Sequence, residues 1–396
     1  MTQLTSFEKR LKRQVVSKPA EFFAATAPGL EPLCLQELQT LSLSTSGGCV
    51  TTGGVTFTGH LQDCYLANLC LRTANRVLMR IGAFTASNFS TLEKKLAAIP
   101  WELYLHSGRP LRFHVTARHS RLYHSGAIAE RLKKAIDARW PKAGIDPKPN
   151  EGAALSQRIF IRVVDDQFAV SLDSSGESLY RRGLKKQVTA APLRETIAAA
   201  MLMLAGYSPS EPLVDPMCGA GSFSLEAAMR AHHIPAGWFR DFAFSGWPAF
   251  ALTRRRWNHT KDQCTQGIVN TTNAAIFAAD IDPSACKALE ENATDTGLSA
   301  SIAVSNRNFF DLTPREFGLA PGLLTINPPF GRRMGSPQQS DALFQDLCNR
   351  LKAVWRGWRV ALVVPRKGLL KRIPFPFSVQ EIHHGGLRLY LTTGDL

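Results

Sequence analysis

The sequence lacks the signals that would place the protein in an export, membrane or metal-binding class. Its 396 residues include eight cysteines, but no two of them form a Cys-x-x-Cys pair, so neither a zinc ribbon nor a dithiol redox motif is expected, and no metal site is predicted. The N-terminal stretch has charge without an apolar core, unlike a signal peptide, and no apolar run approaches the length of a membrane span. Free thiols without an export signal predict a cytoplasmic protein.

Acidic residues are scarce relative to basic ones. Lysine and arginine number 47 against 32 aspartate and glutamate, which gives a formal net charge of +15 and a sequence pI of about 9.7. Nucleic acid is the commonest partner for such an excess, although a basic surface that only keeps the protein soluble is the alternative. A hydrophobic content of 44% is ordinary for a globular protein, and the length favours two domains.

The pattern of apolar residues changes along the chain and divides it into three parts. Residues 1–19 are expected to form a basic arm that either contacts phosphates or, as is usual for a terminus, is a frayed end. Residues 20–180 predict an α+β region of short elements, with a hairpin turn at Asp165-Asp166 and a helix capped by Ser125. In residues 181–396 apolar strands alternate with helices, which predicts a parallel sheet covered on both faces.

A loop with two glycines follows the first apolar strand of this third part. Gly219 and Gly221 would let the backbone pass close under a ligand. A dinucleotide-binding loop would need a third glycine where Ser224 stands, and the lysine of a P-loop is missing. Because Asp215 at the start of the loop would repel phosphate, the loop predicts a ligand with a cationic amino-acid group. A tight turn that only allows close packing is the alternative.

Two further loops follow strands of the same predicted sheet. Asp280 closes one strand, where its carboxylate could accept both hydroxyls of a ribose, whereas Asp282 is expected to cap the next helix. Asn308 and Phe309 begin the other loop, and an amide and a ring suit the edge and face of adenine; taken alone, a strand end with core phenylalanines would suit the same residues. Since ligands bind beyond the carboxyl ends of parallel strands, these loops are expected to border one site.

The most informative stretch is Asn327-Pro328-Pro329-Phe330, at the end of another buried strand. The two prolines fix an extended, rigid turn, and Pro328 has no N–H, so the turn offers hydrogen-bond acceptors. The side-chain oxygen of Asn327 and the carbonyl of Pro328 can both face one NH2 group, and Phe330 can stack on a ring. Acceptors placed in this way favour the nucleophilic state of an exocyclic base amine and stabilise the positive charge that develops on it.

Five stretches, in this order along the chain, resemble THUMP-domain RNA methyltransferases of the class I, S-adenosylmethionine-dependent kind. They read LDSSGESLYRRGLKKQVTAAPLRETIAAAML, DPMCGAGSFSLEAA, RDFAFSGWPAF, ADIDPSACKALEENA and NPPFGRRM, and RLYHSGAIAERLKKAI resembles the THUMP helix region. Within that group the chain is similar, over residues 20–396, to the N-terminal half of bacterial enzymes that make N2-methylguanine in large-subunit ribosomal RNA.

The resemblance implies an α/β protein with an N-terminal α+β THUMP or ferredoxin-like region, followed by a Rossmann-like class I methyltransferase domain. It implies S-adenosylmethionine as cofactor and RNA as partner. The residues it assigns to the cofactor are Asp215, Gly219, Gly221, Asp280, Asn308 and Phe309, and those it assigns to the target amine are Asn327, Pro328, Pro329 and Phe330. Asn308 departs from the family pattern, in which an aspartate is more usual.

The resemblance also implies that the N-terminal half captures RNA through phosphate contacts, which position a nucleic acid rather than specify its sequence. The basic residues expected to take part are Arg109, Arg112, Arg118, Arg121, Arg131, Lys133 and Lys134. A solvated helix face is the alternative for these residues. Trp247 and residues 254–256, three arginines, lie between the cofactor strands, and they either border the base pocket or form a surface loop packed on the tryptophan.

Several functions stay open at this level. A transfer RNA guanine-N2 methyltransferase is the nearest alternative to a ribosomal RNA enzyme. An N6-adenine DNA methyltransferase is less favoured, since the Asn-Pro-Pro-Phe turn also serves adenine but no DNA-recognition module is evident. A non-catalytic RNA-binding assembly factor would keep the fold without needing an intact turn.

Overall fold

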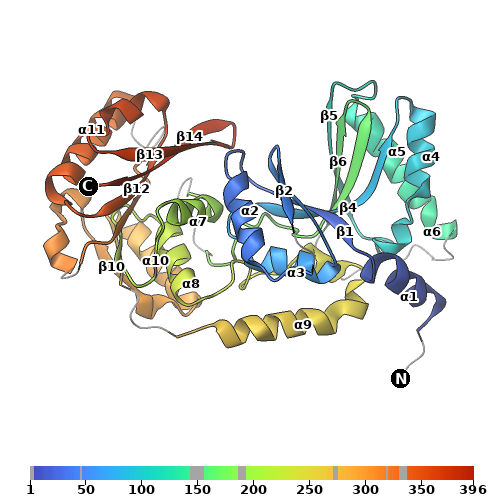
Figure 1. The fold of residues 1–396 in the computed structure, drawn as a ribbon, viewed down its shortest axis with the longest axis horizontal. Coiled ribbons are helices and arrows are strands. Elements are labelled where there is room, and N and C mark those ends of the chain that lie inside the picture. Colours follow the sequence, from blue (N-terminus) through green and yellow to red (C-terminus); the bar gives the residue numbers. More distant parts are fainter. Residues whose placement is uncertain are drawn as a thin grey trace.

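The computed structural model describes residues 4–44, 47–142, 156–185, 193–270, 275–317, 320–329 and 337–396. Their strands form two seven-stranded sheets, the first built from the N-terminal half of the chain and the second from the C-terminal half. Figure 1 shows the two halves side by side, with helix α9 running below α2 and α3 of the N-terminal half. Among the described helices, none combines the length and the apolar character needed to cross a membrane.

The first sheet has the order β2-β3-β1-β4-β7-β6-β5, and its neighbouring strands are antiparallel except for the pair β5 and β6. Its strands are β1 Ala20–Ala25, β2 Gly48–Thr51, β3 Gly54–Gly59, β4 Arg76–Thr85, β5 Leu111–Arg118, β6 Gln157–Val164 and β7 Gln167–Asp173. The helices of this half are α1 Ser6–Leu11, α2 Glu31–Thr40, α3 Leu61–Cys70, α4 Phe89–Ala98, α5 Ser125–Asp137 and α6 Arg139–Lys142. The predicted α+β region is confirmed.

Local sequence explains the hairpin of this sheet but not the start of α5. Asp165 and Asp166 join β6 to β7 with φ angles of 50° and 60°, the left-handed conformation that a two-residue hairpin turn requires. The predicted turn is therefore confirmed. The prediction that Ser125 caps α5 is wrong, because Ser125 is already the first helical residue and His124 occupies the cap position without a side-chain hydrogen bond.

The N-terminal segment is folded rather than frayed. Thr5 caps α1, with Glu8 accepting from the backbone of Thr5 in return, and a π-helical turn continues to residue 16. Leu11 and Val15 follow one another at helical spacing and are buried in the core of the N-terminal half. Arg10 reaches Glu102 at 2.7 Å. The expectation of a frayed arm over residues 1–19 is therefore wrong for the described part of that segment, because its apolar face finds a core.

The second sheet has the order β10-β9-β8-β11-β12-β14-β13. The first five strands of this order are parallel, as predicted, and β14 and β13 are antiparallel to their neighbours. A tight turn through Gly385 and Gly386, both with positive φ, lets β13 return directly as β14 without a crossover helix. The strands are β8 Leu213–Asp215, β9 Ile276–Asp280, β10 Ile302–Asn306, β11 Leu323–Ile326, β12 Arg359–Val364, β13 Phe377–His384 and β14 Leu387–Asp395.

Five helices accompany this sheet: α7 Glu195–Leu204, α8 Ser222–Ala231, α9 Phe250–Gly267, α10 Pro283–Asp295 and α11 Pro337–Val354. The start of α10 follows the sequence prediction, since the side chain of Asp282 accepts a hydrogen bond from the backbone N–H of Ser284 and Pro283 is the first helical residue. This cap orients the turn that follows β9, which is where the candidate site lies.

Helix α9 belongs in sequence to the second half but packs against the first. The hydroxyls of Tyr65 on α3 and Thr253 on α9 lie 2.8 Å apart, and Figure 1 shows α9 running along the lower side of the molecule. Trp247, just before α9, is buried in the N-terminal core and donates to Gln157 at 3.0 Å. Trp247 therefore anchors this segment in the N-terminal half, and the arginines at 254–256 are exposed on the helix that follows.

A buried ion cluster joins the two halves. Glu226 on α8 has no exposed surface and accepts from Arg72 at 2.7 Å and from Arg182 at 3.4 Å. Burial raises the pKa of Glu226, but the two guanidinium groups outweigh it and hold that pKa below its ordinary value. The carboxylate is thus kept ionised between two cations, which fixes the N-terminal half to the helix that follows the glycine loop.

Candidate active site

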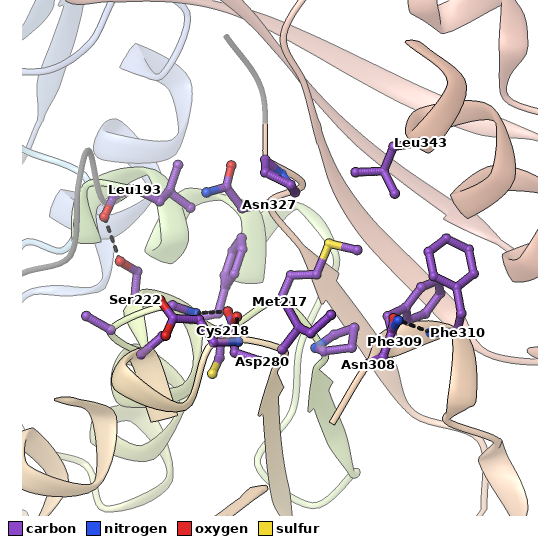
Figure 2. Close-up of a pocket in the computed structure, with 18 residues that line it drawn as sticks. Leu193, Met217, Cys218, Ser222, Asp280, Asn308, Phe309, Phe310, Asn327 and Leu343 are labelled. Carbon is purple, nitrogen blue, oxygen red and sulfur yellow. Dashed lines mark hydrogen bonds between the residues drawn. The ribbon is translucent and has the colours of Figure 1, made fainter. Parts of the chain in front are cut away.

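A cavity of about 580 Å³ lies at the carboxyl ends of β8, β9, β10 and β11. These four strands are neighbours in the sheet. β9 lies on one side of β8 and β11 lies on its other side, so the cavity sits where the strand order reverses. The lining residues are Leu193, Pro216, Met217, Cys218, Gly219, Ala220, Ser222, Phe223, Asp280, Ile281, Asp282, Ala285, Asn308, Phe309, Phe310, Asn327, Pro329 and Leu343. Figure 2 shows them converging from separate loops.

The loop from β8 to α8 forms the floor of the cavity. Gly219 has a φ of 53°, a left-handed backbone conformation that residues with a Cβ atom rarely adopt. The turn is held to the next strand by one backbone and one side-chain acceptor. The N–H of Cys218 donates to the carbonyl of Ala279 at 3.0 Å, and the N–H of Gly219 donates to Oδ2 of Asp280 at 2.8 Å. The first and second loops are therefore one rigid unit.

Asp215, which the resemblance assigned to the cofactor, is not among the residues that line the cavity. It ends β8 with no exposed surface, and its Oδ2 accepts from Ser224 at 2.7 Å. Its Oδ1 has no hydrogen-bond partner among the described residues. Burial raises the pKa of Asp215 to about 7, against the opposing effect of the Ser224 hydrogen bonds. The carboxylate lies beneath the loop rather than on its surface, because the last residue of a central strand is covered on both faces.

Gly221 also stays outside the cavity, and packing explains why it is glycine. Its φ is 82°, and a Cβ built there would lie 2.2 Å from Cδ1 of Leu289 on α10. Gly221 therefore allows α10 to approach the start of α8. This close packing fits the alternative considered from the sequence, a tight turn, and a role of Gly221 at the cofactor stays a prediction.

Asp280 faces the cavity from the end of β9. Its Oδ2 accepts from Gly219, and its Oδ1 accepts from the N–H of Asp282 at 3.0 Å. These two bonds fix the plane of the carboxylate, and each oxygen keeps a further lone pair. The side chain lies at the base of the cavity in Figure 2. A ligand with neighbouring hydroxyl groups has an oriented acceptor here.

Asn308 and two phenylalanines form another wall. Oδ1 of Asn308 accepts from the N–H of Phe310 at 3.1 Å, which caps a short 3-10 helix over Phe309–Asp311. This bond leaves the Nδ2 group as the freer end of the amide, so Asn308 offers a donor. Phe309 is buried and stacks on Trp355. Phe310 packs edge-on against Phe309. The wall is thus apolar with one polar edge.

Asn327 and Pro329 border the cavity on the side of β11. Oδ1 of Asn327 is buried and has no hydrogen-bond partner in the described part of the chain. Pro328 is buried and does not line the cavity, and Phe330 lies outside the described residues. In Figure 2 Asn327 and Asp280 approach the cavity from opposite sides, with Met217 between them. An unpaired acceptor here is costly unless a ligand donates to it.

The residues present fit a cationic cofactor that carries a ribose and an adenine. Among the described lining residues there is no lysine or arginine, while Asp280 and Asp282 contribute carboxylates and Asp215 lies beneath the floor. Such a lining repels phosphate and favours a positive charge. Ile281, which is 70% exposed, and the wall at Phe309 supply apolar surface for a ring. A cavity of this size also suits a ligand of nucleoside class.

Comparison with known proteins decides the family. The RMKL-like methyltransferase domain matches residues 182–384, and the RlmL ferredoxin-like domain matches residues 21–78. A Synechocystis protein, slr0064, that is named provisionally as an RNA methyltransferase is 32% identical over 95% of this chain and 96% of its own length. The chain belongs to the RMKL-like methyltransferase family.

Two more relatives extend this result. The ribosomal RNA large subunit methyltransferase K/L of Syntrophotalea carbinolica is 32% identical over 96% of this chain and 54% of its own length, so the chain spans about half of that relative. The crystal structure of SMU.472 complexed with SAH superposes with a TM-score of 0.85 at 27% identity, over 96% of this chain and 99% of that one. The class I methyltransferase fold and the bound SAH of this neighbour indicate S-adenosylmethionine as the cofactor of the family member described here.

Sequence reasoning missed part of this methyltransferase cavity. Ile281 stands between Asp280 and Asp282. An apolar residue directly after an acidic strand end was the pattern that could have pointed to it, and its side chain is exposed in the structure. Leu193 stands in the first of the five quoted stretches but had no role assigned to it, and Leu343 comes from α11, outside those stretches; the fold brings both to the cavity. Among the described residues, no group of three or more His, Cys, Asp or Glu side chains is arranged to hold a metal ion.

Proposed function

We propose that this chain transfers a methyl group to an exocyclic amine of a base in RNA, and that the amine is N2 of guanine in large-subunit ribosomal RNA. The observation that carries the proposal is the unpaired Oδ1 of Asn327, which borders the candidate cofactor cavity. A buried acceptor without a donor suits a ligand that brings N–H groups to the site.

The chemistry of an aromatic amine explains why an acceptor is needed. Its lone pair is delocalised into the base, so the nitrogen is a poor nucleophile. Oδ1 of Asn327 and the carbonyl of Pro328 would accept from the two N–H groups, hold the nitrogen in line and stabilise the charge that it gains. When bound, S-adenosylmethionine supplies a methyl group already activated by a sulfonium centre. Stacking of the base on Phe330 stays a prediction from the sequence.

The cofactor would be held by the other loops. We assign the ribose hydroxyls to Asp280, whose carboxylate is already oriented by two backbone N–H groups. The adenine ring would lie between Ile281 and the wall at Phe309, with the amide of Asn308 at its edge. Asp215 would lie beneath the floor, where its ionised form would attract the positive charge of the cofactor without touching it.

RNA is the substrate class that the names of the relatives and the charge of the chain support together. The K/L relative is named for large-subunit ribosomal RNA, and the net charge of +15 suits a polyanion. Transfer RNA is the competing RNA substrate, and the experiments below separate the two. We further propose that the enzyme acts in the cytoplasm, a location that suits its free cysteines and an RNA substrate.

The test of this proposal is an Asn327→Ala variant. We expect methyl transfer to RNA to fall by about a hundredfold or more, the usual loss when one stabilising contact to developing charge is removed. Binding of S-adenosylhomocysteine, measured by calorimetry, should stay within about threefold of the wild type, because Asn327 is assigned to the amine. Asn327→Asp keeps an acceptor oxygen and should retain more activity than the alanine variant. Loss of cofactor binding in either variant would refute the assigned role.

A further inference from the structure

A second cavity, of about 740 Å³, opens on the outer face of β5 and β6 in the N-terminal half. Its lining includes four arginines, Arg76, Arg112, Arg158 and Arg181, against a single carboxylate at its rim, Glu177. We call it the arginine groove. In β5 and β6 the side chains at even-numbered positions are more exposed than those at odd-numbered positions. The charged and aromatic residues at the even-numbered positions therefore project away from the side on which α5 packs against β5.

The strand register places like charges side by side. In the parallel pair of β5 and β6, Arg112 is the direct partner of Arg158. Like charges opposite one another on a sheet are destabilising. Arg158 is partly compensated by Glu177 at 3.1 Å and by Asp173 at 3.9 Å. Arg112 is exposed and makes no ion pair or hydrogen bond of its own among the described residues. A bound anion would relieve this repulsion.

Two of the arginines are held in place by backbone and acid groups. Arg76 donates to the carbonyl of Gly176 at 2.6 Å and pairs with the buried carboxylate of Asp173. Arg158 donates to the same carbonyl. These contacts fix both guanidinium groups along one wall of the arginine groove before any ligand arrives, which lowers the entropy cost of binding one.

The next position along the same two strands carries aromatic rings. His114 pairs in register with Phe160, and their rings stack with centroids 4.7 Å apart and an interplanar angle of 14°. The guanidinium of Arg76 lies 5.5 Å from the Phe160 centroid. His114 is the exposed end of this row on the edge strand. Burial, and then the charges of Arg158, Arg76 and Arg112, lower the pKa of His114, so its ring is neutral at neutral pH.

We propose that the arginine groove holds one unpaired nucleotide of the RNA, with the base stacked on His114 and a phosphate on Arg112 and Arg158. An aromatic ring beside guanidinium groups is the combination that binds single strands, because every base has a face to stack and every nucleotide carries a phosphate. A base within a duplex has both faces covered and cannot reach the ring. The ligand class rests on the function proposed above.

The arginine groove lies within reach of the methyl-transfer site. Arg181 lines the groove and Leu193 lines the cofactor cavity. Positions 181 and 193 are twelve residues apart, so the chain between them spans at most about 43 Å. A single RNA strand can therefore occupy the groove while a base further along enters the catalytic cavity. The groove would position the RNA, and the Asn327 site would select the base.

The test is the binding of a fluorescein-labelled single-stranded RNA of mixed sequence to the full chain, followed by anisotropy. His114→Ala and Arg112→Ala are each expected to weaken binding by about tenfold, and His114→Phe should restore it because the ring is kept. Arg162→Ala is the matched control. Arg162 is exposed on the same face of β6, roughly 13 Å along the strand from Arg158, and does not line the groove. It should change affinity by less than about twofold.

Salt dependence separates phosphate contact from general attraction. Arg112→Ala should reduce the slope of log Kd against log salt by about 0.7 for the phosphate contact that is lost, while His114→Ala should leave the slope unchanged. An equal effect of Arg162→Ala, or equal binding of a blunt RNA duplex, would overturn the proposal. Because the assay requires no methyl transfer, an inactive enzyme with normal groove behaviour would refute the proposed function and leave this inference standing.

Discussion

The carboxylate of Asp280 and the backbone N–H of Gly219 are joined by a hydrogen bond of 2.8 Å. This bond ties the end of β9 to the glycine loop after β8, so two of the four loops around the cavity share one rigid connection. It also explains why Asp280 is oriented in the absence of a ligand. The same side chain therefore has a structural role and, in the proposed function, a binding role.

Asp280→Asn separates these roles. The amide can keep the bond from Gly219 through its oxygen, but its NH2 group then opposes the N–H of Asp282 and offers one acceptor fewer to the ribose. We expect the Kd for S-adenosylmethionine to rise by about tenfold or more in calorimetry. Asp282→Asn is the matched control, since it removes a neighbouring negative charge and keeps a good helix cap. An equal loss in the control would show that charge alone, rather than an oriented contact, holds the cofactor.

Gly221→Ala should destabilise the protein through packing. The new Cβ meets Leu289 at 2.2 Å and sits at a φ of 82°, so both overpacking and backbone strain oppose it. We expect the free energy of unfolding in urea to fall by about 2 to 4 kcal/mol. Gly297→Ala is the matched control. Gly297 has a φ of 71° with open space around it, so this substitution should lower the free energy of unfolding by about 1 kcal/mol. If the two substitutions cost the same, the contact with Leu289 is not what requires glycine.

Asp215 predicts a dependence of stability on pH. Its pKa is raised to about 7 in the folded protein from an ordinary value of 3.8. Between pH 4 and pH 7 the side chain of Asp215 is deprotonated in the unfolded chain but still protonated in the folded one. Its contribution to the free energy of unfolding is therefore full below pH 4 and is lost as the pH rises through 7. Asp215→Asn should abolish this component. The difference in unfolding free energy between wild type and variant should shift by a few kcal/mol from pH 4 to pH 8. A difference independent of pH would mean that Asp215 is ionised throughout.

The sequence predicted those parts of the fold that depend on local chemistry. Asp165-Asp166 makes a left-handed hairpin turn and Asp282-Pro283 starts a helix because each depends on neighbouring residues. The alternation of apolar strands with helices predicted the parallel strands of the second sheet, since burial on both faces leaves that pattern in the sequence. The domain boundaries drawn from the sequence stay a prediction.

Apart from the cap of α5, the errors lie where distant segments meet. Leu11 is buried because the N-terminal helix finds a core built by later strands, which its basic composition conceals. Of the ten predicted site residues the structure brings six to one cavity: Gly219, Asp280, Asn308, Phe309, Asn327 and Pro329. Asp215 is buried and accepts a hydrogen bond from Ser224, and Gly221 packs closely against Leu289. The side to which a side chain points depends on packing that the sequence does not state locally.

The central claim is methylation of guanine N2 in RNA, and its most direct test is the product. Labelled methyl from S-adenosylmethionine would be transferred by the purified chain to RNA from a strain lacking the gene, followed by separation of ribosomal and transfer RNA and nucleoside analysis by mass spectrometry. We predict label in N2-methylguanosine of large-subunit ribosomal RNA. The same nucleoside in transfer RNA alone would overturn the substrate assignment. Label in DNA adenine, or no label in any nucleic acid, would contradict the account.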